Sequence, residues 1–346
     1  LIRMVHPKPA NAERKALYAW IVGRPYDEAQ LPALVQAYEA FKRDPRGLPP
    51  DLPFQYFSTL PLDAAQWSAL ARSASWQSMR MNLNTFARNG VFEDPAMVSA
   101  IAARLRDPAQ VRRARVLPYQ LLMAYQASAS LPQQIPEALQ DAMETATAQV
   151  PVLPGRVVVA VDVSGSMQWP VTGYRKGASS AVRCVDVAAL IAACVLRGQP
   201  LATVLPFDTE VRPVRLNPRD SVMTLAAQLA INGGGTSVSA PLEHLNHRRE
   251  QVDLVVLVSD NESWRDTRKG GATATMQAWD VLKQRCPQAR LVCIDLQPVA
   301  SSQTVQREDV LHIGGFSDAV FDLLAQFAQA PGDGSGGVER IEDMPL

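Results

Sequence analysis

Cysteine and histidine are scarce, with four of each in 346 residues. The four cysteines show no CxxC spacing, which predicts core thiols in a reducing compartment, with a zinc site as the alternative. They are Cys184, Cys194, Cys286 and Cys293. The histidines are scattered, and the sequence has no Walker A motif, no HExxH and no serine or cysteine nucleophile with an evident base. We therefore expect that the protein is not an enzyme.

Long apolar runs and an excess of one charge are also missing. No stretch of about 18 apolar residues occurs, and the start of the chain lacks the layout of a secretory signal. Lysine plus arginine and aspartate plus glutamate number 34 each, so the net charge gives no argument for nucleic acid or an anionic membrane. These absences predict a cytoplasmic protein with no membrane partner. The chain opens on a patterned segment without an initiator methionine, which predicts that an N-terminal stretch precedes it.

Helical periodicity dominates the first half of the chain. Apolar residues recur at spacings of three and four in segments such as 31–41 and 117–125, and no strand pattern competes. Start signals recur as well: Asp63 with Gln66 resembles a capping box, and Asp94 precedes a proline at the first helical position. Short helices with short connectors indicate an α-helical solenoid, although no strict repeat defines its period.

The periodicity changes at residues 150–156, a proline and glycine hinge. Beyond the hinge, strand-like runs alternate with helical patterns, which predicts right-handed βαβ units in a doubly wound, mostly parallel sheet. The predicted strands lie near 157–162, 202–207, 252–259, 289–296 and 310–313. The predicted helices lie near 180–197, 220–230, 239–246, 272–285 and 317–330. The glycine-rich end, 331–346, is flexible by composition.

Oxygen-bearing side chains follow two of the predicted strands and a glycine turn. Carboxyl ends of parallel strands meet at one edge of an open α/β sheet, where ligands bind. Each motif alone would be a structural turn, but their conjunction favours one divalent-cation site, in which Gly165 permits the tight turn. Mg²⁺ accepts oxygen ligands, and two carboxylates balance its charge and leave a coordination position open. The predicted ligands are Asp162, Ser164, Ser166, Thr236 and Asp260.

These motifs in this order resemble a von Willebrand factor A domain with a metal-ion-dependent adhesion site. The resemblance implies that Ser164, Ser166 and Thr236 bind Mg²⁺ directly. It implies that Asp162 and Asp260 act directly or through water. It also implies that the open position takes a carboxylate or another acidic group from a protein partner.

Stretches of the helical half resemble the TROVE module of the Ro60 ribonucleoprotein family. They lie at residues 1–9, 79–83, 86–91 and 114–119, and further matching stretches lie at 260–264 and 314–318. The order of TROVE followed by von Willebrand A resembles a bacterial-type member of that family over nearly the whole chain. We thus expect an α-helical, HEAT-like solenoid followed by a doubly wound, Rossmann-like domain. The expected domains are the C-terminal part of a TROVE module at 1–150, a von Willebrand A domain at 151–330 and a flexible tail at 331–346.

This second resemblance implies RNA binding. In the family, a ring of helical repeats holds small Y RNAs on its outer face and accepts single-stranded ends of misfolded RNAs through its hole, and the von Willebrand A domain closes the ring. The leading hypothesis is thus an RNA-binding protein of RNA quality control, with a Mg²⁺ site for partner docking or stability. The alternative is a metal-dependent protein-interaction adaptor without RNA binding.

Basic residues of the helical half are the predicted RNA contacts. Arg3, His6 and Lys8 lie in a proline-broken opening that corresponds to an RNA-facing segment of the family, with a solvated connector as the alternative. Arg112 and Arg113 lie in a basic row that would bind the RNA backbone, or would simply form a solvated face. The other members of the row are Arg104, Arg106 and Arg115.

Other polar and aromatic side chains of this half have a structural interpretation. Trp20, Trp67 and Trp76 could stack on bases, but their helical spacing favours core packing. Arg80 and Asn82 lie in an apolar helix, which favours a buried structural network over RNA contact.

Overall fold

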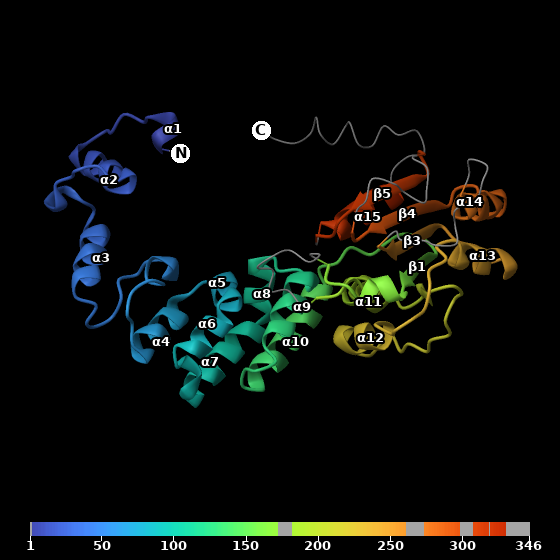
Figure 1. Ribbon diagram of the computed structural model, residues 1–346, viewed down its shortest axis with the longest axis horizontal. Helices are drawn as coiled ribbons and strands as arrows, with labels where there is room; N and C mark the ends of the chain where they lie inside the picture. The colour runs from blue at the N-terminus through green and yellow to red at the C-terminus, as the bar shows by residue number, and fades with distance from the viewer. Residues whose placement is uncertain (1, 172–181, 261–272, 298–306, 318, 330–346) are drawn as a thin grey trace. The chain divides into compact units, whose positions relative to one another are not determined.

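The computed structural model describes residues 2–171, 182–260, 273–297, 307–317 and 319–329 (Figure 1). The predicted flexible tail, 331–346, lies outside them. Contacts divide the chain into two compact units, residues 1–105 with 130–135, and residues 106–129 with 136–346. No helix of the described residues has the length and hydrophobicity needed to cross a membrane.

Ten α-helices precede the first strand in the described chain, as the helical periodicity predicts. They are α1 (Ile2–Val5), α2 (Ala12–Val22), α3 (Ala33–Arg43), α4 (Ala64–Ser73), α5 (Trp76–Met81), α6 (Leu83–Arg88), α7 (Pro95–Arg106), α8 (Pro108–Ala114), α9 (Pro118–Ala127) and α10 (Gln134–Thr147). Short 3₁₀ turns join some of them, η1 (Glu28–Gln30), η2 (Phe54–Tyr56) and η3 (Val91–Glu93).

Capping side chains start these helices where the sequence predicts. The Asp63 carboxylate accepts a hydrogen bond from the Gln66 amide at 2.8 Å, and the Gln66 side chain accepts one from the Asp63 amide at 3.0 Å, which is a complete capping box. Asp94 accepts a hydrogen bond from the Ala96 amide at 2.9 Å, and α7 begins at Pro95. Local hydrogen bonds therefore mark both helix starts, and the Gln66 side chain also donates to the Pro45 and Gly47 carbonyls.

Aromatic side chains build the core of the first unit. Tyr38 lies edge to face with Phe57 at 5.7 Å between ring centroids, and Phe41 contacts the same ring at 5.7 Å. Trp67 and Trp76 are buried, and the Trp76 indole donates hydrogen bonds to backbone carbonyls at the end of α7. The predicted core role of these two tryptophans is confirmed.

The second half contains a five-stranded, fully parallel sheet in the order β2-β1-β3-β4-β5. The strands are β1 (Val157–Asp162), β2 (Thr203–Phe207), β3 (Leu254–Ser259), β4 (Arg290–Asp295) and β5 (Val310–Gly314). The helices are α11 (Cys184–Gly198), α12 (Val222–Leu229), α13 (Ala240–His247), α14 (Ala274–Arg285) and α15 (Val320–Gln329), with the 3₁₀ turn η4 (Gly165–Gln168) after β1. The predicted doubly wound sheet is confirmed.

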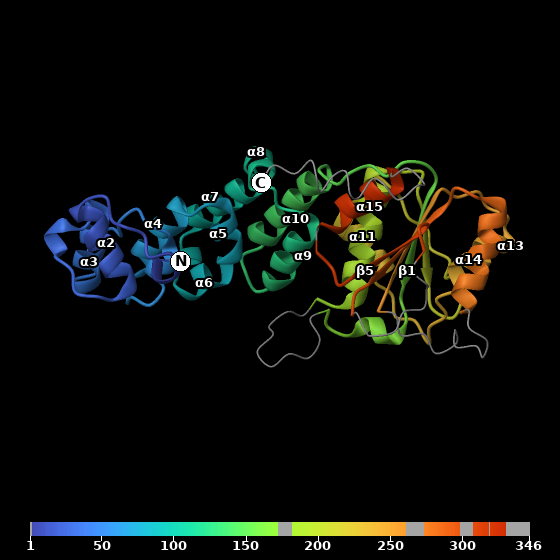
Figure 2. The same cartoon turned by 90° about the horizontal axis from the view of Figure 1, so that it is seen from above.

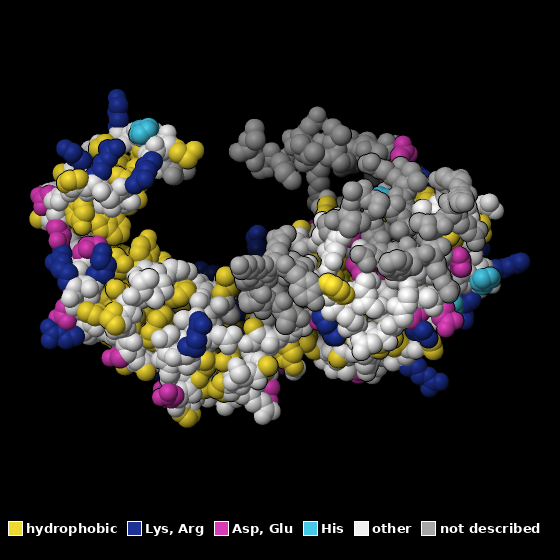
Figure 3. Space-filling view, in the orientation of Figure 1, with side chains coloured by type: hydrophobic (Ala, Val, Ile, Leu, Met, Phe, Trp, Pro, Cys, Tyr) yellow, Lys and Arg dark blue, Asp and Glu magenta, His cyan; other side chains and the backbone are white. Residues whose placement is uncertain are grey.

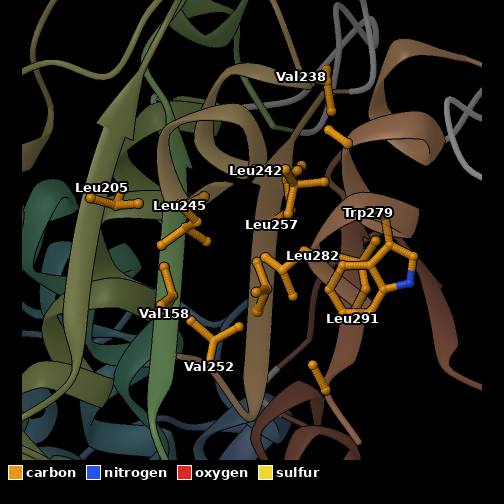
Figure 4. Packing of buried hydrophobic residues seen from close by; sticks show 14 of the residues in the cluster. Val158, Leu205, Val238, Leu242, Leu245, Val252, Leu257, Trp279, Leu282 and Leu291 are labelled. Atoms are coloured by element: carbon orange, nitrogen blue, oxygen red, sulfur yellow. The ribbon is translucent and has the colours of Figure 1, made fainter. Parts of the chain in front are cut away.

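Helices cover both faces of this sheet (Figure 2). Helices α13 and α14 pack on one face, where Leu242, Leu245 and Trp279 meet side chains of β1 and β3 (Figure 4). Helix α11 packs on the other face and contacts β1, β2 and β3. Every residue of β1 and β3 is buried, which explains why these strands are uninterrupted apolar runs instead of alternating ones.

Helix α11 begins at Cys184, later than the predicted start near 180. Arg183 adopts an extended conformation and pairs with Pro170 in an isolated bridge, and its amide donates to the Asp186 carboxylate at 2.9 Å. The bridge to Pro170 cannot be read from helical periodicity.

Helices α9 and α10 join the sheet domain although they belong to the helical half by fold type. The Gln126 amide donates to Asp186 of α11 at 3.3 Å. Glu144 of α10 accepts hydrogen bonds from the Val222 amide at 2.7 Å and from the Arg197 guanidinium at 3.3 Å. The predicted boundary at 150 follows the change of fold type, whereas these contacts place α9 and most of α10 in the second compact unit.

Removing the Glu144 carboxylate tests this connection. We expect Glu144→Ala to lower the free energy of unfolding by about 1–2 kcal/mol, because the first turn of α12 loses an acceptor and Arg197 loses its ion pair. Glu144→Gln keeps an acceptor and should cost less. Urea denaturation followed by circular dichroism measures both variants, and equal stability of wild type and Glu144→Ala would contradict the role.

Candidate functional site

The site lies at the carboxyl edge of the sheet, where neighbouring strands end at the same level. Asp162 is paired in register with Phe207, so Asp208 follows directly on the adjacent strand. On the other side, Val161 is paired with Val258, and Asp260 follows two residues later. All three aspartates are buried. The parallel register thus places three carboxylates at one edge.

Asp162, like Asp208, has no exposed surface. Its Oδ2 accepts a hydrogen bond from the Ser259 hydroxyl at 2.6 Å, and its Oδ1 accepts one from the Ser164 amide at 2.8 Å. Burial raises the pKa of Asp162 to about 7 against the lowering effect of these hydrogen bonds, and the Asp260 carboxylate adds to the rise. A cation beside the two carboxylates would offset both the burial cost and the repulsion.

The two predicted serine ligands lie close together. Ser164 directly precedes η4, and Ser166 lies within it. The Ser164 and Ser166 hydroxyl oxygens lie 3.3 Å apart. Adjacent oxygens on an octahedral Mg²⁺ at about 2.1 Å would lie about 3 Å apart. The spacing of the two hydroxyls therefore suits neighbouring positions on one ion.

A glycine loop brings Thr236 against the first loop. The Gly165 amide donates to the Gly234 carbonyl at 2.9 Å, and the Gly233 amide donates to the Val163 carbonyl at 2.7 Å. A Cβ on Gly233 would lie 2.5 Å from that carbonyl oxygen, so only glycine permits this approach. Thr236 is 2% exposed, two residues beyond Gly234. The structure thus brings all five predicted ligands to one edge.

Asp208 was not predicted as a site residue, yet it holds the glycine loop in place. Its carboxylate accepts hydrogen bonds from the Gly234 amide at 2.9 Å and from the Arg212 guanidinium at 3.0 and 2.7 Å. Burial alone would raise the pKa of Asp208, but the hydrogen bonds from Arg212 and from backbone amides lower it to about 2. The sequence did carry a signal for Asp208: it directly follows strand β2, just as the predicted ligand Asp162 ends strand β1.

The donor set fits Mg²⁺ better than zinc. Among the described residues, no three histidine, cysteine, aspartate or glutamate side chains group together as metal ligands, so a cation at this edge would need the hydroxyl oxygens as well as the carboxylates. Hard oxygen donors of this kind suit Mg²⁺. All four cysteines are free, and burial raises the pKa of the Cys184 thiol to about 11, as expected of a core thiol.

The predicted basic residues of the opening segment lie at a groove. Arg3 and His6 line a groove of about 510 Å³ between α1 and α2, together with Lys15, Tyr18 and Arg24. None of the described residues that line this groove is acidic. Arg3 donates to the Val22 carbonyl at 2.8 Å. Lys8 is exposed outside the groove lining. Figure 3 shows blue and cyan side chains gathered over this part of the chain.

The basic row divides into structural and exposed members. Arg104 donates to two backbone carbonyls in the last turn of α4 and to a third at its C-cap, which gives this side chain a structural role. Arg106 forms an ion pair with Asp141 at 3.3 Å. Arg112 and Arg113 of α8 are exposed, and neither forms an ion pair with a carboxylate in the described part of the chain.

The remaining residues considered above have local partners. Arg80 is half-buried and donates to Gln77 at 3.1 and 3.0 Å, and Asn82 donates to the Ser78 carbonyl at 2.7 Å. These hydrogen bonds within α5 and at its end support the predicted structural role.

A methyl group on Gly233 should disrupt the cation site. We expect Gly233→Ala to weaken Mg²⁺ binding by about tenfold or more, because the loop that carries Thr236 must move away from Val163. Gly198→Ala is the matched control, since a Cβ there meets no atom within 4 Å. Isothermal titration with MgCl₂ measures both, and unchanged affinity in Gly233→Ala would exclude this loop from the site.

Asp208→Asn should destabilise the chain in a pH-dependent way. The folded-state pKa of Asp208 lies below that of the unfolded chain, so the ionised carboxylate contributes stability that is complete above about pH 5 and is lost as the pH falls towards 2. We expect Asp208→Asn to cost about 1–2 kcal/mol at pH 7 and progressively less towards pH 2. Denaturation at several pH values measures the difference, and a constant difference would contradict the ion pair.

Comparison with known proteins places the chain in a family. Residues 156–328, half of the chain, match the family described as the Ro60 vWA domain. The "RNA-binding protein RO60" of Deinococcus radiodurans is 28% identical over 358 residues, which cover 95% of this chain and 65% of that protein. The crystal structure of the Deinococcus radiodurans RO (RSR) protein matches with a TM-score of 0.72 at 25% identity, over 95% of this chain and 69% of that one. The chain, which spans about 65% of its curated relative's length, therefore belongs to the Ro60 family.

Proposed function

We propose that the chain is a non-catalytic RNA-binding protein of the Ro60 type. It holds small, structured, Y-like RNAs and the single-stranded ends of misfolded RNAs, and its sheet edge binds Mg²⁺ for partner docking or for stability. The relative named as an RNA-binding protein aligns with 95% of the chain, which supports RNA as the ligand class.

The observation that carries the proposal is the exposed arginine pair of α8. Arg104 and Arg106, earlier in the same basic row, are occupied by carbonyls and by Asp141. Arg112 and Arg113 are exposed and form no ion pair with a carboxylate in the described chain. Guanidinium groups in this state are available to bind phosphate oxygens.

The groove between α1 and α2 supports a second contact with RNA. Its lining combines basic side chains with proline, aliphatic and tyrosine surfaces. Such a lining suits a phosphate group together with an unstacked base. RNA-binding proteins commonly bind unstacked bases on aromatic side chains. Arg3 and His6 would contact RNA there, and Lys8 would contact it at the exposed rim.

The neutral net charge favours a second candidate, an adaptor in which the cation site alone is functional. In that case a protein partner would supply a carboxylate to the open position of the ion. The two candidates differ in RNA affinity. Only the first predicts that RNA binds through Arg112 and Arg113 and that this affinity falls as the salt concentration rises.

Titration of RNA against salt separates the candidates. We expect a structured small RNA and an RNA with a single-stranded 3′ tail to bind with an affinity that falls steeply with salt. Arg112→Gln with Arg113→Gln should weaken both, and should reduce the slope of log K against log salt by about 1.4 for single-stranded RNA, at about 0.7 per lost phosphate contact.

The matched control removes the same charge elsewhere. Arg248→Gln with Arg249→Gln changes two exposed arginines at the end of α13, and should leave the salt slope unchanged. Absence of RNA binding below micromolar concentrations at low salt, or equal effects of the two double variants, would overturn the proposal in favour of the adaptor.

A further inference from the structure

A cavity of about 510 Å³ lies among helices α9, α10 and α12, and none of the five predicted cation ligands lines it. Its lining residues all belong to the second compact unit. A second cavity, of about 260 Å³, shares three of them. Protein cavities that hold small molecules measure about 300–1,000 Å³, so the first one has room for a small ligand. Its lining residues are Tyr125, Gln140, Met223, Thr224, Ala227 and Gln228.

An aromatic ring and a thioether give the cavity apolar surface. Tyr125 and Met223 are half-buried and line both cavities. The Gln140 amide donates to the Tyr125 hydroxyl at 3.1 Å, which limits the movement of the ring. Ala227 also lines both cavities, and its single methyl group leaves the space beside it unfilled. Aromatic rings and thioethers pack well against the face of a planar heterocycle.

Glutamine side chains give the cavities hydrogen-bonding capacity. Gln228 is exposed, and its side chain forms no hydrogen bond with another described residue. Gln126 of the second cavity donates to Asp186 at 3.3 Å. Each glutamine amide has two N–H donors and a carbonyl acceptor, so Gln140 and Gln126 keep capacity beyond these single hydrogen bonds. A purely apolar ligand would desolvate such groups without replacing their bonds to water, which opposes binding.

The charges of the two cavities disfavour an anionic group inside them. Among the described residues that line them, Arg183 is the one arginine or lysine. Its guanidinium donates to Asp186 at 3.1 and 2.6 Å and to Gln168 at 2.6 Å. A phosphate group needs an available cation, and this one is already engaged. The part of a ligand that enters is therefore neutral, with flat apolar faces and a polar edge.

We propose that this cavity binds an unpaired adenine base. The faces of the base pack on Tyr125 and Met223, as unpaired bases stack on aromatic side chains. The Gln228 amide donates to the ring nitrogen N7 and accepts from the exocyclic amine, which is how glutamine recognises adenine. The base belongs to a free adenine nucleoside or to RNA. The inference uses neither the cation site nor Arg112 and Arg113, so it goes beyond the proposed function.

Titration of the whole chain with adenosine tests the proposal. Equilibrium dialysis with labelled adenosine, up to millimolar concentrations, should show one site. Uridine should bind about tenfold or more weakly, because it lacks the N6 amine and N7 acceptor. Ala227→Phe fills the cavity and should weaken adenosine binding by about tenfold or more. Gln228→Leu removes the amide and should abolish most of the preference for adenosine over uridine.

Two substitutions of the same kind elsewhere are the controls. Ala100→Phe on α7 and Gln277→Leu on α14 change exposed residues outside both linings, and should leave adenosine affinity unchanged. Gln228→Leu decides the matter if circular dichroism shows that Ala227→Phe is misfolded. Adenosine binding that survives both cavity variants, or that is no tighter than uridine binding, would overturn the proposal.

Decaadenylate and decauridylate separate the two sources of the base. A base taken from RNA predicts that Ala227→Phe weakens decaadenylate binding and leaves decauridylate binding unchanged. A free nucleoside predicts that Ala227→Phe weakens adenosine binding alone. If adenosine binding is too weak to detect, decaadenylate decides, and equal affinity of wild type and Ala227→Phe would overturn the proposal. RNA binding that still depends on Arg112 and Arg113 would then leave the proposed function intact.

Discussion

The carboxylate of Asp162 is buried at the end of a fully buried strand, and its charge must be compensated there. The rest of the site depends on this requirement. A charge without exposed surface is costly unless hydrogen bonds or a counter-ion compensate it. Ser259 and Ser164 provide the hydrogen bonds, yet the pKa of Asp162 stays raised to about 7. A divalent cation would offset the remaining cost, and the hydroxyl oxygens of Ser164 and Ser166 lie 3.3 Å apart, a separation that suits two ligands of one ion.

The sheet and the meeting of the five predicted ligands at one of its edges could be predicted, because both depend on local sequence. Strand β1 is an uninterrupted apolar run that ends in an acidic residue, and α/β sheets place such ends at one edge. The capping box at Asp63 is equally local. Asp208 was missed because its role depends on Gly234, whose amide comes from a loop far along the chain. The structural role of Arg104 could not be predicted either, because its carbonyl partners lie at the end of another helix.

Helices of the first half of the chain belong to the compact unit of the sheet, which the order of the sequence motifs does not indicate. Helices α9 and α10 are helical in pattern, but Gln126 and Glu144 bind side-chain and backbone groups of α11 and α12. The exposed arginines of α8 therefore lie in the same compact unit as the cation site. The proposed RNA contacts of α8 and the proposed cation site would then lie in one compact unit.

The central claim is that the three loops at the carboxyl edge bind one divalent cation. Crystals soaked in MnCl₂ and measured at the manganese absorption edge test it most directly. The account predicts a single anomalous peak within about 2.3 Å of the hydroxyl oxygens of Ser164 and Ser166, beside Asp162 and Asp260. An edge without a peak, in crystals where the Ser259 hydroxyl still donates to Asp162, would contradict it.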